Sequence, residues 1–277
     1  MAKKLNGVSS TLTIIFAIFL IACSDSPDDG VNLQDWSAKK IAITSENDLR
    51  EFALQVNGGR NFFGQTVILE RNIELSDGEW VPIGDLSTNP FRGVFDGGGN
   101  VIGGVGQSSI GGFSGLFGHL YDAEVKNLGL VVNMNISEYS NSAIGGLAIV
   151  NVGTIRNSYV SGNIKISVNQ ESFIGGAIVA LNSGVIENSY ANVAIETSNA
   201  IGALAGGNHG VIKNSFALRR NVGDVFFAVG DGSICENSGL KSTEEMRQKN
   251  TFVAWDFVNL WGIAPNINDG FPYLQNR

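Results

Sequence analysis

Among the residues of this chain, the acidic side chains are the main candidates for catalysis. A glycosidase needs two carboxyl groups about 5–10 Å apart, one of them working as a general acid. Glu171 and Glu196 lie in or near bends of the repeat described below and are the acids that could approach each other. Few of the nine acids between Gly115 and Leu240 share an equivalent repeat position: Asp122, Glu124, Glu138, Glu171, Glu187, Glu196, Asp224, Asp231 and Glu236. We therefore predict that the chain is not an enzyme, with a polysaccharide-active lyase or glycosidase as the alternative.

The sequence gives little support for a metal site or a phosphate-binding loop. The two histidines, His119 and His209, are far apart in the sequence and have no acidic cluster beside them, so they predict no zinc site. Gly97-Gly98-Gly99 lacks the Lys-Ser/Thr of a phosphate-binding loop. Residues 96–100 lack the ligand spacing of a calcium loop. We expect no cofactor and no metal.

The N-terminus has the pattern of an export signal. Lys3 and Lys4 precede an apolar run that ends at Leu20-Ile21-Ala22-Cys23, and this run is too short for a membrane span. The last four residues resemble the lipobox of bacterial lipoproteins, which implies cleavage before Cys23 and a lipid on its sulfur. A plain signal peptide is the alternative. Once Cys23 is acylated, Cys235 is left alone and no intramolecular disulfide can form.

A short acidic stretch follows the predicted lipid site. Residues 24–30 read SDSPDDG, a composition typical of a disordered tether, and they resemble the acidic export signal of some surface lipoproteins. The chain has a net charge of −8, and loss of residues 1–22 would leave 16 basic against 26 acidic residues, a net charge of −10. This balance argues against nucleic-acid partners. We predict an outer membrane lipoprotein of a diderm bacterium that faces the cell surface and contacts the membrane through Cys23.

A seven-residue motif recurs along the chain. Residues 153–159 read GTIRNSY, residues 184–190 read GVIENSY and residues 210–216 read GVIKNSF, with degenerate copies at 124–128 and 232–238. The asparagines are 30, 31, 26 and 23 residues apart. A unit of this length that recurs in tandem indicates a solenoid, because one unit cannot bury its apolar side alone.

The pattern inside each unit indicates which solenoid forms. Apolar and polar residues alternate with period 2, so Ile155, Asn157 and Tyr159 are expected on one strand face and Arg156 and Ser158 on the other. An apolar Gly-rich run and an Asn-X-Gly turn precede this strand, and a third extended segment follows it. Three strands per unit predict an all-β, right-handed parallel β-helix.

Stacking would bring equivalent side chains together at a spacing of about 4.8 Å. We predict an inner apolar ladder of Val125, Ile155, Ile186, Ile212 and Ile234. We predict an amide ladder of Asn127, Asn157, Asn188, Asn214 and Asn237, each donating to the next coil. Aromatic rings would stack at Tyr159, Tyr190 and Phe216. The outward row Lys126, Arg156, Glu187, Lys213 and Glu236 is interpreted as register-setting charge pairs, with a ligand stripe as the alternative.

Both ends of the solenoid carry predicted caps. Ser45 can cap a helix whose apolar face is Leu49, Phe52, Ala53 and Val56, and Ser242–Glu245 is a capping box for a second helix. The aromatic set at the C-terminus is expected to plug the last coil, with a sugar-binding platform as the alternative: Trp255, Phe257, Trp261, Phe271 and Tyr273. The predicted organisation is a signal peptide (1–22), a tether (23–35), an N-terminal cap with first coils (36–110), repeats (111–241) and a C-terminal cap (242–277).

The region 36–277 resembles bacterial surface proteins with GLUG-type repeats. The resemblance is carried by WVPIG at 80–84, FRGVFDGGGN at 91–100, GLFG at 115–118 and GFPYL at 270–274. Residues 145–149, 175–179 and 202–206 depart from the usual Gly-Gly-Leu-Val-Gly. Such repeats occur in adhesin-like proteins and beside secreted proteases, so the resemblance implies a cell-surface role without fixing a ligand.

These observations combine into one functional hypothesis with two alternatives. We expect a lipid-anchored, monomeric surface β-solenoid that binds an extracellular protein or a glycan. The long bends are the expected contact sites, with Glu138, Tyr139, Glu171 and Glu196 as candidate ligand contacts. The alternatives are the polysaccharide-active enzyme and a passive envelope spacer.

Overall fold

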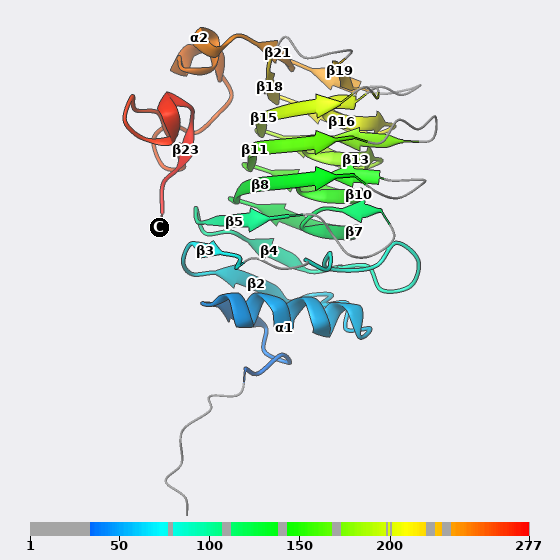
Figure 1. Cartoon of the computed structure of the whole chain (residues 1–277). Helices are drawn as coiled ribbons and strands as arrows, with labels where there is room; N and C mark the ends of the chain where they lie inside the picture. Colours follow the sequence, from blue (N-terminus) through cyan, green and yellow to red (C-terminus); the bar gives the residue numbers. More distant parts are fainter. Residues whose placement is uncertain are drawn as a thin grey trace, which may run out of the picture. The chain divides into compact units, whose positions relative to one another are not determined.

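The computed structural model describes a stack of parallel β-coils (Figure 1). It describes residues 34–76, 80–106, 112–137, 143–167, 173–197, 199, 201–219, 225–228 and 234–276, and for 225–228 only the backbone. The predicted signal peptide, Cys23 and most of the predicted tether therefore lie outside the described residues. The compact unit formed by Gln34–Arg277 is the one described below.

Two parallel sheets form the walls of the coils. The larger sheet has 14 strands: β1 (Lys40–Ile43), β2 (Thr66–Leu69), β4 (Val94–Asp96), β6 (Phe113–Ser114), β7 (Phe117–Lys126), β9 (Ala143–Gly145), β10 (Ala148–Arg156), β12 (Ile174–Gly176), β13 (Val179–Asn182), β14 (Val185–Glu187), β16 (Ile201–Asn208), β17 (Val211–Lys213), β19 (Val225–Ala228) and β20 (Ile234–Glu236). The smaller sheet has seven: β3 (Ile73–Glu74), β5 (Val101–Val105), β8 (Gly129–Ile136), β11 (Tyr159–Ile166), β15 (Tyr190–Thr197), β18 (Phe216–Leu218) and β21 (Gly239–Lys241). The parallel stacking confirms the predicted β-solenoid, and its right hand remains a prediction.

Strand register follows the repeat. Ile155 pairs with Val125 on one side and Ile186 on the other, and these three side chains and that of Ile212 are fully buried. The last rung of this ladder was predicted wrongly, because Cys235 and not Ile234 pairs with Ile212. The final copy of the repeat is shifted by one residue relative to the prediction, so Ile234 is half-exposed on the outer side.

The Asn-X-Gly segments were predicted as turns, and the structure shows bends of different sharpness. In the first copy β10 runs unbroken from Ala148 to Arg156, with a register shift between Val152 and Thr154. Within these bends a second row of asparagines is completely buried: Asn151, Asn182 and Asn208. Asn151 Nδ2 donates to Asn182 Oδ1 at 2.8 Å, and Asn182 Nδ2 donates to Asn208 Oδ1 at 2.7 Å. This row fixes the bend of one coil against the next.

The N-terminal cap forms as the sequence predicts. The helix α1 (Glu46–Asn57) begins after Ser45, whose Oγ accepts the Asp48 N–H at 3.1 Å. Its four apolar residues are buried, and the ring of Phe52 contacts Phe91 and Phe95 of the first coils at centroid distances of 5.5 and 5.9 Å. The helix lies across the first-coil end of the stack (Figure 1).

The C-terminal segment runs along the side of the solenoid, beside the smaller sheet (Figure 1). It contains α2 (Thr243–Met246), the 3₁₀ turns η1 (Lys249–Thr251) and η2 (Asn268–Gly270), and the antiparallel pair β22 (Trp261–Gly262) and β23 (Tyr273–Leu274). Its apolar residues form one cluster with the outward-facing ring ladder: Tyr159, Tyr190, Phe216, Met246, Phe252, Trp255, Trp261, Phe271 and Leu274. The predicted plug over the last coil is therefore wrong, and the aromatic set seals a side wall.

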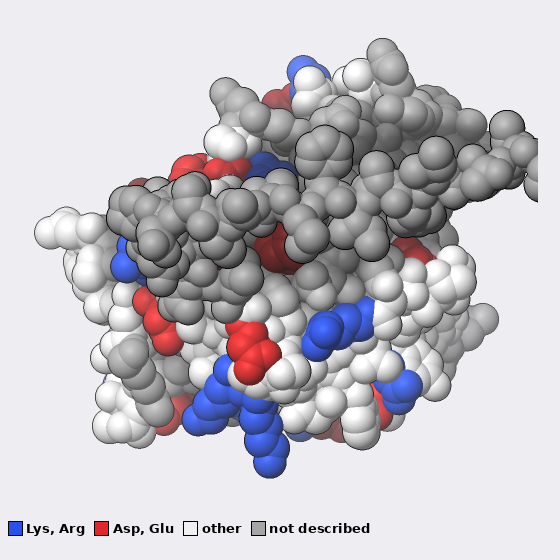
Figure 2. All heavy atoms as spheres, turned by 90° about the horizontal axis from the view of Figure 1, so that it is seen from below, with Lys and Arg blue, Asp and Glu red and all other residues white. Residues whose placement is uncertain are grey.

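Charge on the surface is mixed in sign. Seen from the end that carries α1, basic and acidic side chains alternate over the visible part of that face (Figure 2). Within the described part of the chain, no helix is both long enough and apolar enough to cross a membrane.

Candidate functional site

The predicted contact residues in the bends do not form a described site. Cys23, Glu138, Tyr139 and Glu171 lie outside the described residues. Glu196 lies in β15, where it pairs with Lys165 of β11 at 3.5 Å. Both side chains are more than half exposed, and pairs of this kind contribute little to stability.

The asparagines of the predicted amide ladder occupy the corner between two strands. All five have left-handed backbone angles, with φ between 43° and 53° at Asn127, Asn157, Asn188, Asn214 and Asn237. Asn157 donates to Asn127 at 3.4 Å and Asn237 donates to Asn214 at 2.9 Å, so in these two bonds the predicted direction is wrong and the donor belongs to the later coil. The prediction that Asn157 shares a strand face with Ile155 and Tyr159 is wrong, because β10 ends at Arg156 and β11 starts at Tyr159. Asparagine tolerates this corner conformation better than other residues that have a Cβ.

Three of the corner asparagines are followed by a serine that was predicted to face outward and is instead buried: Ser158, Ser189 and Ser215. Ser189 Oγ donates to the Glu187 carbonyl at 2.8 Å and accepts the Ser158 N–H of the preceding coil at 3.2 Å. Ser215 repeats this arrangement one coil further on. The Asn-Ser dipeptide therefore turns the chain and satisfies the polar backbone groups of the corner.

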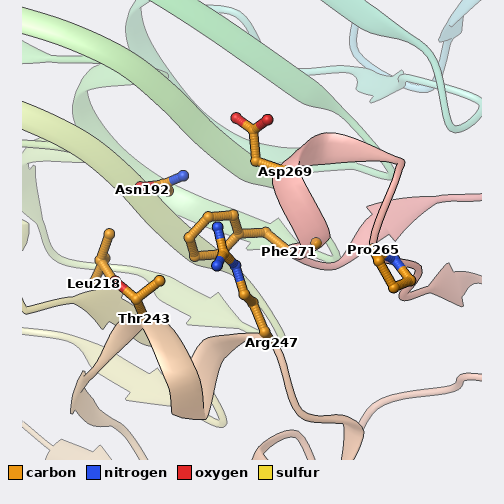
Figure 3. Close-up of a pocket in the computed structure, with 8 residues that line it drawn as sticks. Asn192, Leu218, Thr243, Arg247, Pro265, Asp269 and Phe271 are labelled. Atoms are coloured by element: carbon orange, nitrogen blue, oxygen red, sulfur yellow. The ribbon is translucent and has the colours of Figure 1, made fainter.

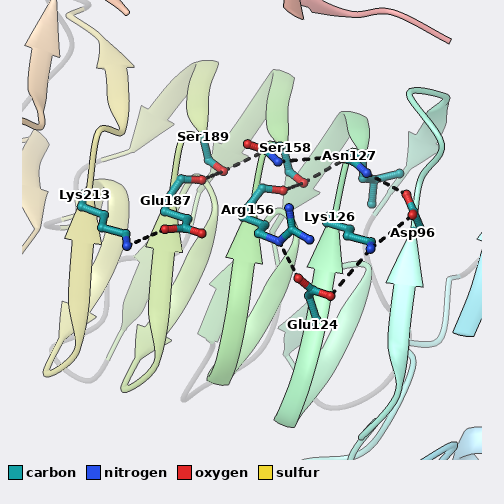
Figure 4. Close-up of polar contacts among 11 residues, drawn as sticks. Asp96, Glu124, Lys126, Asn127, Arg156, Ser158, Glu187, Ser189 and Lys213 are labelled. Carbon is teal, nitrogen blue, oxygen red and sulfur yellow. Dashed lines mark hydrogen bonds and ion pairs between the residues drawn. The ribbon is translucent and has the colours of Figure 1, made fainter. Parts of the chain in front are cut away.

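The charged row on the outside of the larger sheet forms ion pairs between coils (Figure 4). Arg156 binds Glu124, and Lys126 lies 3.4 Å from Asp96. Lys213 donates to Glu187 at 2.6 Å, and this hydrogen bond raises the pKa of the lysine. Each basic group in these pairs already has an acidic partner, so the row serves strand register better than it serves a ligand.

A pocket of about 620 Å³ lies where the C-terminal segment meets the smaller sheet (Figure 3). We call it the C-terminal pocket. Its lining comprises Asn192, Leu218, Thr243, Arg247, Pro265, Asp269, Gly270 and Phe271. The sheet contributes an amide and an aliphatic side chain, and the C-terminal segment contributes the charged groups. Its volume lies in the range of about 300–1,000 Å³ typical of small-molecule sites.

One wall of the C-terminal pocket is a left-handed turn. Asn268, Asp269 and Gly270 follow one another with φ of 49°, 53° and 81°. Asn268 Nδ2 donates to Tyr190 Oη and to the Pro272 carbonyl, each at 2.7 Å. Tyr190 Oη donates to the same carbonyl at 2.7 Å. Tyr190 is fully buried, and this burial raises the pKa of its phenol well above the ordinary value, so the hydroxyl stays protonated.

Arg247 occupies the centre of the C-terminal pocket in Figure 3. Its guanidinium carbon lies 5.3 Å from the centroid of the buried Phe271 ring, and its stem packs on Gly270. Among the described residues, no carboxylate lies within ion-pair distance of this guanidinium. The guanidinium therefore lies over the Phe271 ring without a described acidic partner, and it lines the pocket.

The C-terminal pocket suits recognition of a polar molecule. It combines an exposed guanidinium at Arg247, an exposed carboxylate at Asp269, an amide at Asn192 and a hydroxyl at Thr243. This set was not predicted from the sequence, because the aromatic residues of the C-terminal segment were expected at the end of the solenoid and not along its side. The available signal was the Asn268-Asp269-Gly270 run, whose residue types favour left-handed turns. The described residues contain no cluster of three or more His, Cys, Asp or Glu that could hold a metal ion.

Part of the sequence is similar to a known bacterial protein. No protein-family model matches the chain. A protein of Evansella cellulosilytica described as a "Putative Gly-rich membrane protein" is 33% identical over 129 residues. The match covers 43% of this chain and only 14% of that protein's length.

A solved structure extends the likeness over most of the chain. A crystal structure titled as a "putative immunoglobulin A1 protease from Bacteroides ovatus" matches with a TM-score of 0.53 and 18% identity. The match covers 88% of this chain and 94% of that one. At this identity the likeness supports the β-solenoid fold alone.

Proposed function

We propose that this protein is a lipid-anchored β-solenoid of the bacterial cell surface, related to GLUG-repeat proteins, that binds an extracellular glycan. The C-terminal pocket is the observation that carries the proposal. It places a guanidinium, a carboxylate and an amide around one depression, and these are the groups that fix a polar ligand in a pocket.

The surface location is supported by the N-terminal sequence. A basic start, a short apolar run and Leu20-Ile21-Ala22-Cys23 fit export followed by lipidation at Cys23. Several acyl chains would give stable anchoring, because two membrane signals already suffice. The description of the Evansella protein as a membrane protein agrees with this location.

Binding fits the C-terminal pocket better than hydrolysis does. Among the described residues of its lining, Asp269 is the single carboxylate, whereas glycoside hydrolysis uses a pair about 5–10 Å apart. In the charged row of the larger sheet, Lys126, Arg156 and Lys213 are each paired with an acidic side chain.

Cell adhesion to immobilised glycans tests the proposal. Cells that display the full chain should be retained on at least one glycan surface, and cells with Arg247→Gln and Asp269→Asn together should be lost from it. Lys249→Gln is a matched control, because Lys249 stacks on Phe257 at 5.3 Å in the same segment but does not line the pocket. Equal retention of all cells, or retention that depends on Lys249, would overturn the proposed function.

A further inference from the structure

Two opposite charges line the C-terminal pocket, and they do not bind each other. Arg247 and Asp269 lie on different turns of the C-terminal segment and are not within 4 Å of each other. Neither charge of the lining is paired with the other, so both can contact a ligand. The remaining lining residues that the structure describes are uncharged.

The two charged groups have different supports. Arg247 packs on the Phe271 ring and on Gly270, where a side-chain carbon at position 270 would come within 3.3 Å of Arg247 Nε. Asp269 lies in the left-handed turn, which Asn268 ties to Tyr190 and Pro272. Both charged side chains are exposed, so a ligand can reach them from solvent.

From this arrangement we propose that the ligand is an uncharged pyranose unit, held by adjacent hydroxyls between Arg247 and Asp269. This inference rests on the proposed function and names its ligand class. The guanidinium donates to one hydroxyl oxygen, and the carboxylate accepts from the next hydroxyl. The Asn192 side chain stands on the sheet side of the same space (Figure 3).

Charge balance selects the neutral ligand. One positive and one negative group cancel at a distance, so the pocket attracts neither sign of ligand. The whole chain carries a net charge of −8, which disfavours polyanionic glycans. A cationic glycan would be repelled by the like charge of the Arg247 guanidinium at the centre of the pocket.

Calorimetric titration of the detergent-solubilised full chain tests the inference. The probes are neutral gluco-, galacto- and manno-oligosaccharides, oligogalacturonate as the anionic probe and chitosan oligomers as the cationic one. At least one neutral probe should bind with an affinity that changes less than about twofold between low and high salt. Arg247→Gln and Asp269→Asn should each weaken this binding about tenfold or more, because each removes a charged hydrogen-bonding partner.

The controls separate this inference from the proposed function. Lys249→Gln should leave the affinity unchanged, since it removes a stacked cation outside the pocket. Binding of oligogalacturonate or chitosan alone, lost in the pocket variants, would overturn the neutral ligand and leave the proposed function standing. An affinity for a neutral probe that neither pocket substitution changes would overturn the proposed contacts of the ligand with Arg247 and Asp269. Absence of binding to every probe would overturn the inference, and the cell-adhesion test would then decide the proposed function by itself.

Discussion

Substitution of Asn182 by alanine should reveal how much the buried asparagine row contributes to stability. Asn182 is completely buried, accepts from Asn151 at 2.8 Å and donates to Asn208 at 2.7 Å. Alanine would leave the Asn151 Nδ2 and the Asn208 Oδ1 without their main partners. Each orphaned buried group costs about 1–3 kcal/mol.

The two orphaned groups would together cost about 2–6 kcal/mol, and weaker remaining contacts place the loss in the lower part of that range. Asn151 Nδ2 keeps a contact of 3.4 Å with the Val185 carbonyl, and Asn208 Oδ1 keeps the Gly210 N–H at 3.3 Å. The free energy of unfolding should therefore fall by about 3 kcal/mol. Equilibrium unfolding in urea, followed by circular dichroism, measures this change.

Asn188→Gly is the matched control in the same coil. Asn188 has a φ of 47°, which glycine adopts freely, and no described partner for its buried Oδ1. Its loss should change the free energy of unfolding by less than about 1 kcal/mol. A loss below about 0.5 kcal/mol for Asn182→Ala, or equal losses for the two variants, would refute the importance of the buried row.

Three further outcomes follow from the packing. Gly184→Ala should lower the free energy of unfolding by about 1–3 kcal/mol in urea titrations, because the new Cβ would overlap the Gly153 carbonyl oxygen. Gly239→Ala is the control and should leave the free energy of unfolding unchanged, because no atom lies within 4 Å of the new Cβ. Tyr190→Phe should loosen the C-terminal segment and speed its amide hydrogen exchange, since the hydroxyl bonds Asn268 and Pro272; Tyr159→Phe, whose hydroxyl has no hydrogen-bond partner among the described residues, should not. Burial raises the pKa of Tyr159 to about 12 and that of Tyr190 well above its ordinary value, so the stability of the neutral phenols is complete below pH 10 and is lost as pH rises towards 12. Thermal melts between pH 9 and 12 should show this loss, and a flat profile would contradict it.

The coil architecture could be predicted because the repeat encodes it several times. Ile155, Ile186 and Ile212 keep the same place in each copy, so copies that align in sequence also align in space. The α1 helix could also be predicted, because the capping residue Ser45 and the spacing of the apolar residues both indicate a helix at this place. These features are local and redundant, which makes them readable without a structure.

The corner and the C-terminal segment were harder to predict. Asn157 lies between two strands, and alternation alone cannot distinguish a strand residue from a single left-handed corner residue. From the sequence, the aromatic rings of the C-terminal segment could cover either the last coil or a side wall of the solenoid. They cover the side wall because they pack on the outward-facing rings of Tyr159 and Tyr190, whose centroids are 5.2 Å apart. The C-terminal pocket depends on this docking, so its residues come together only in the folded chain.

The surface location can be tested directly by protease shaving of intact cells, with the native chain and a Cys23→Ala variant compared side by side. Both the glycan-binding proposal and the neutral-sugar inference require the C-terminal pocket to face the outside of the cell. The account predicts that the native chain is digested while the cells remain sealed and that the Cys23→Ala variant is no longer held at the surface. Full protection of the native chain until the cells are lysed would contradict the account.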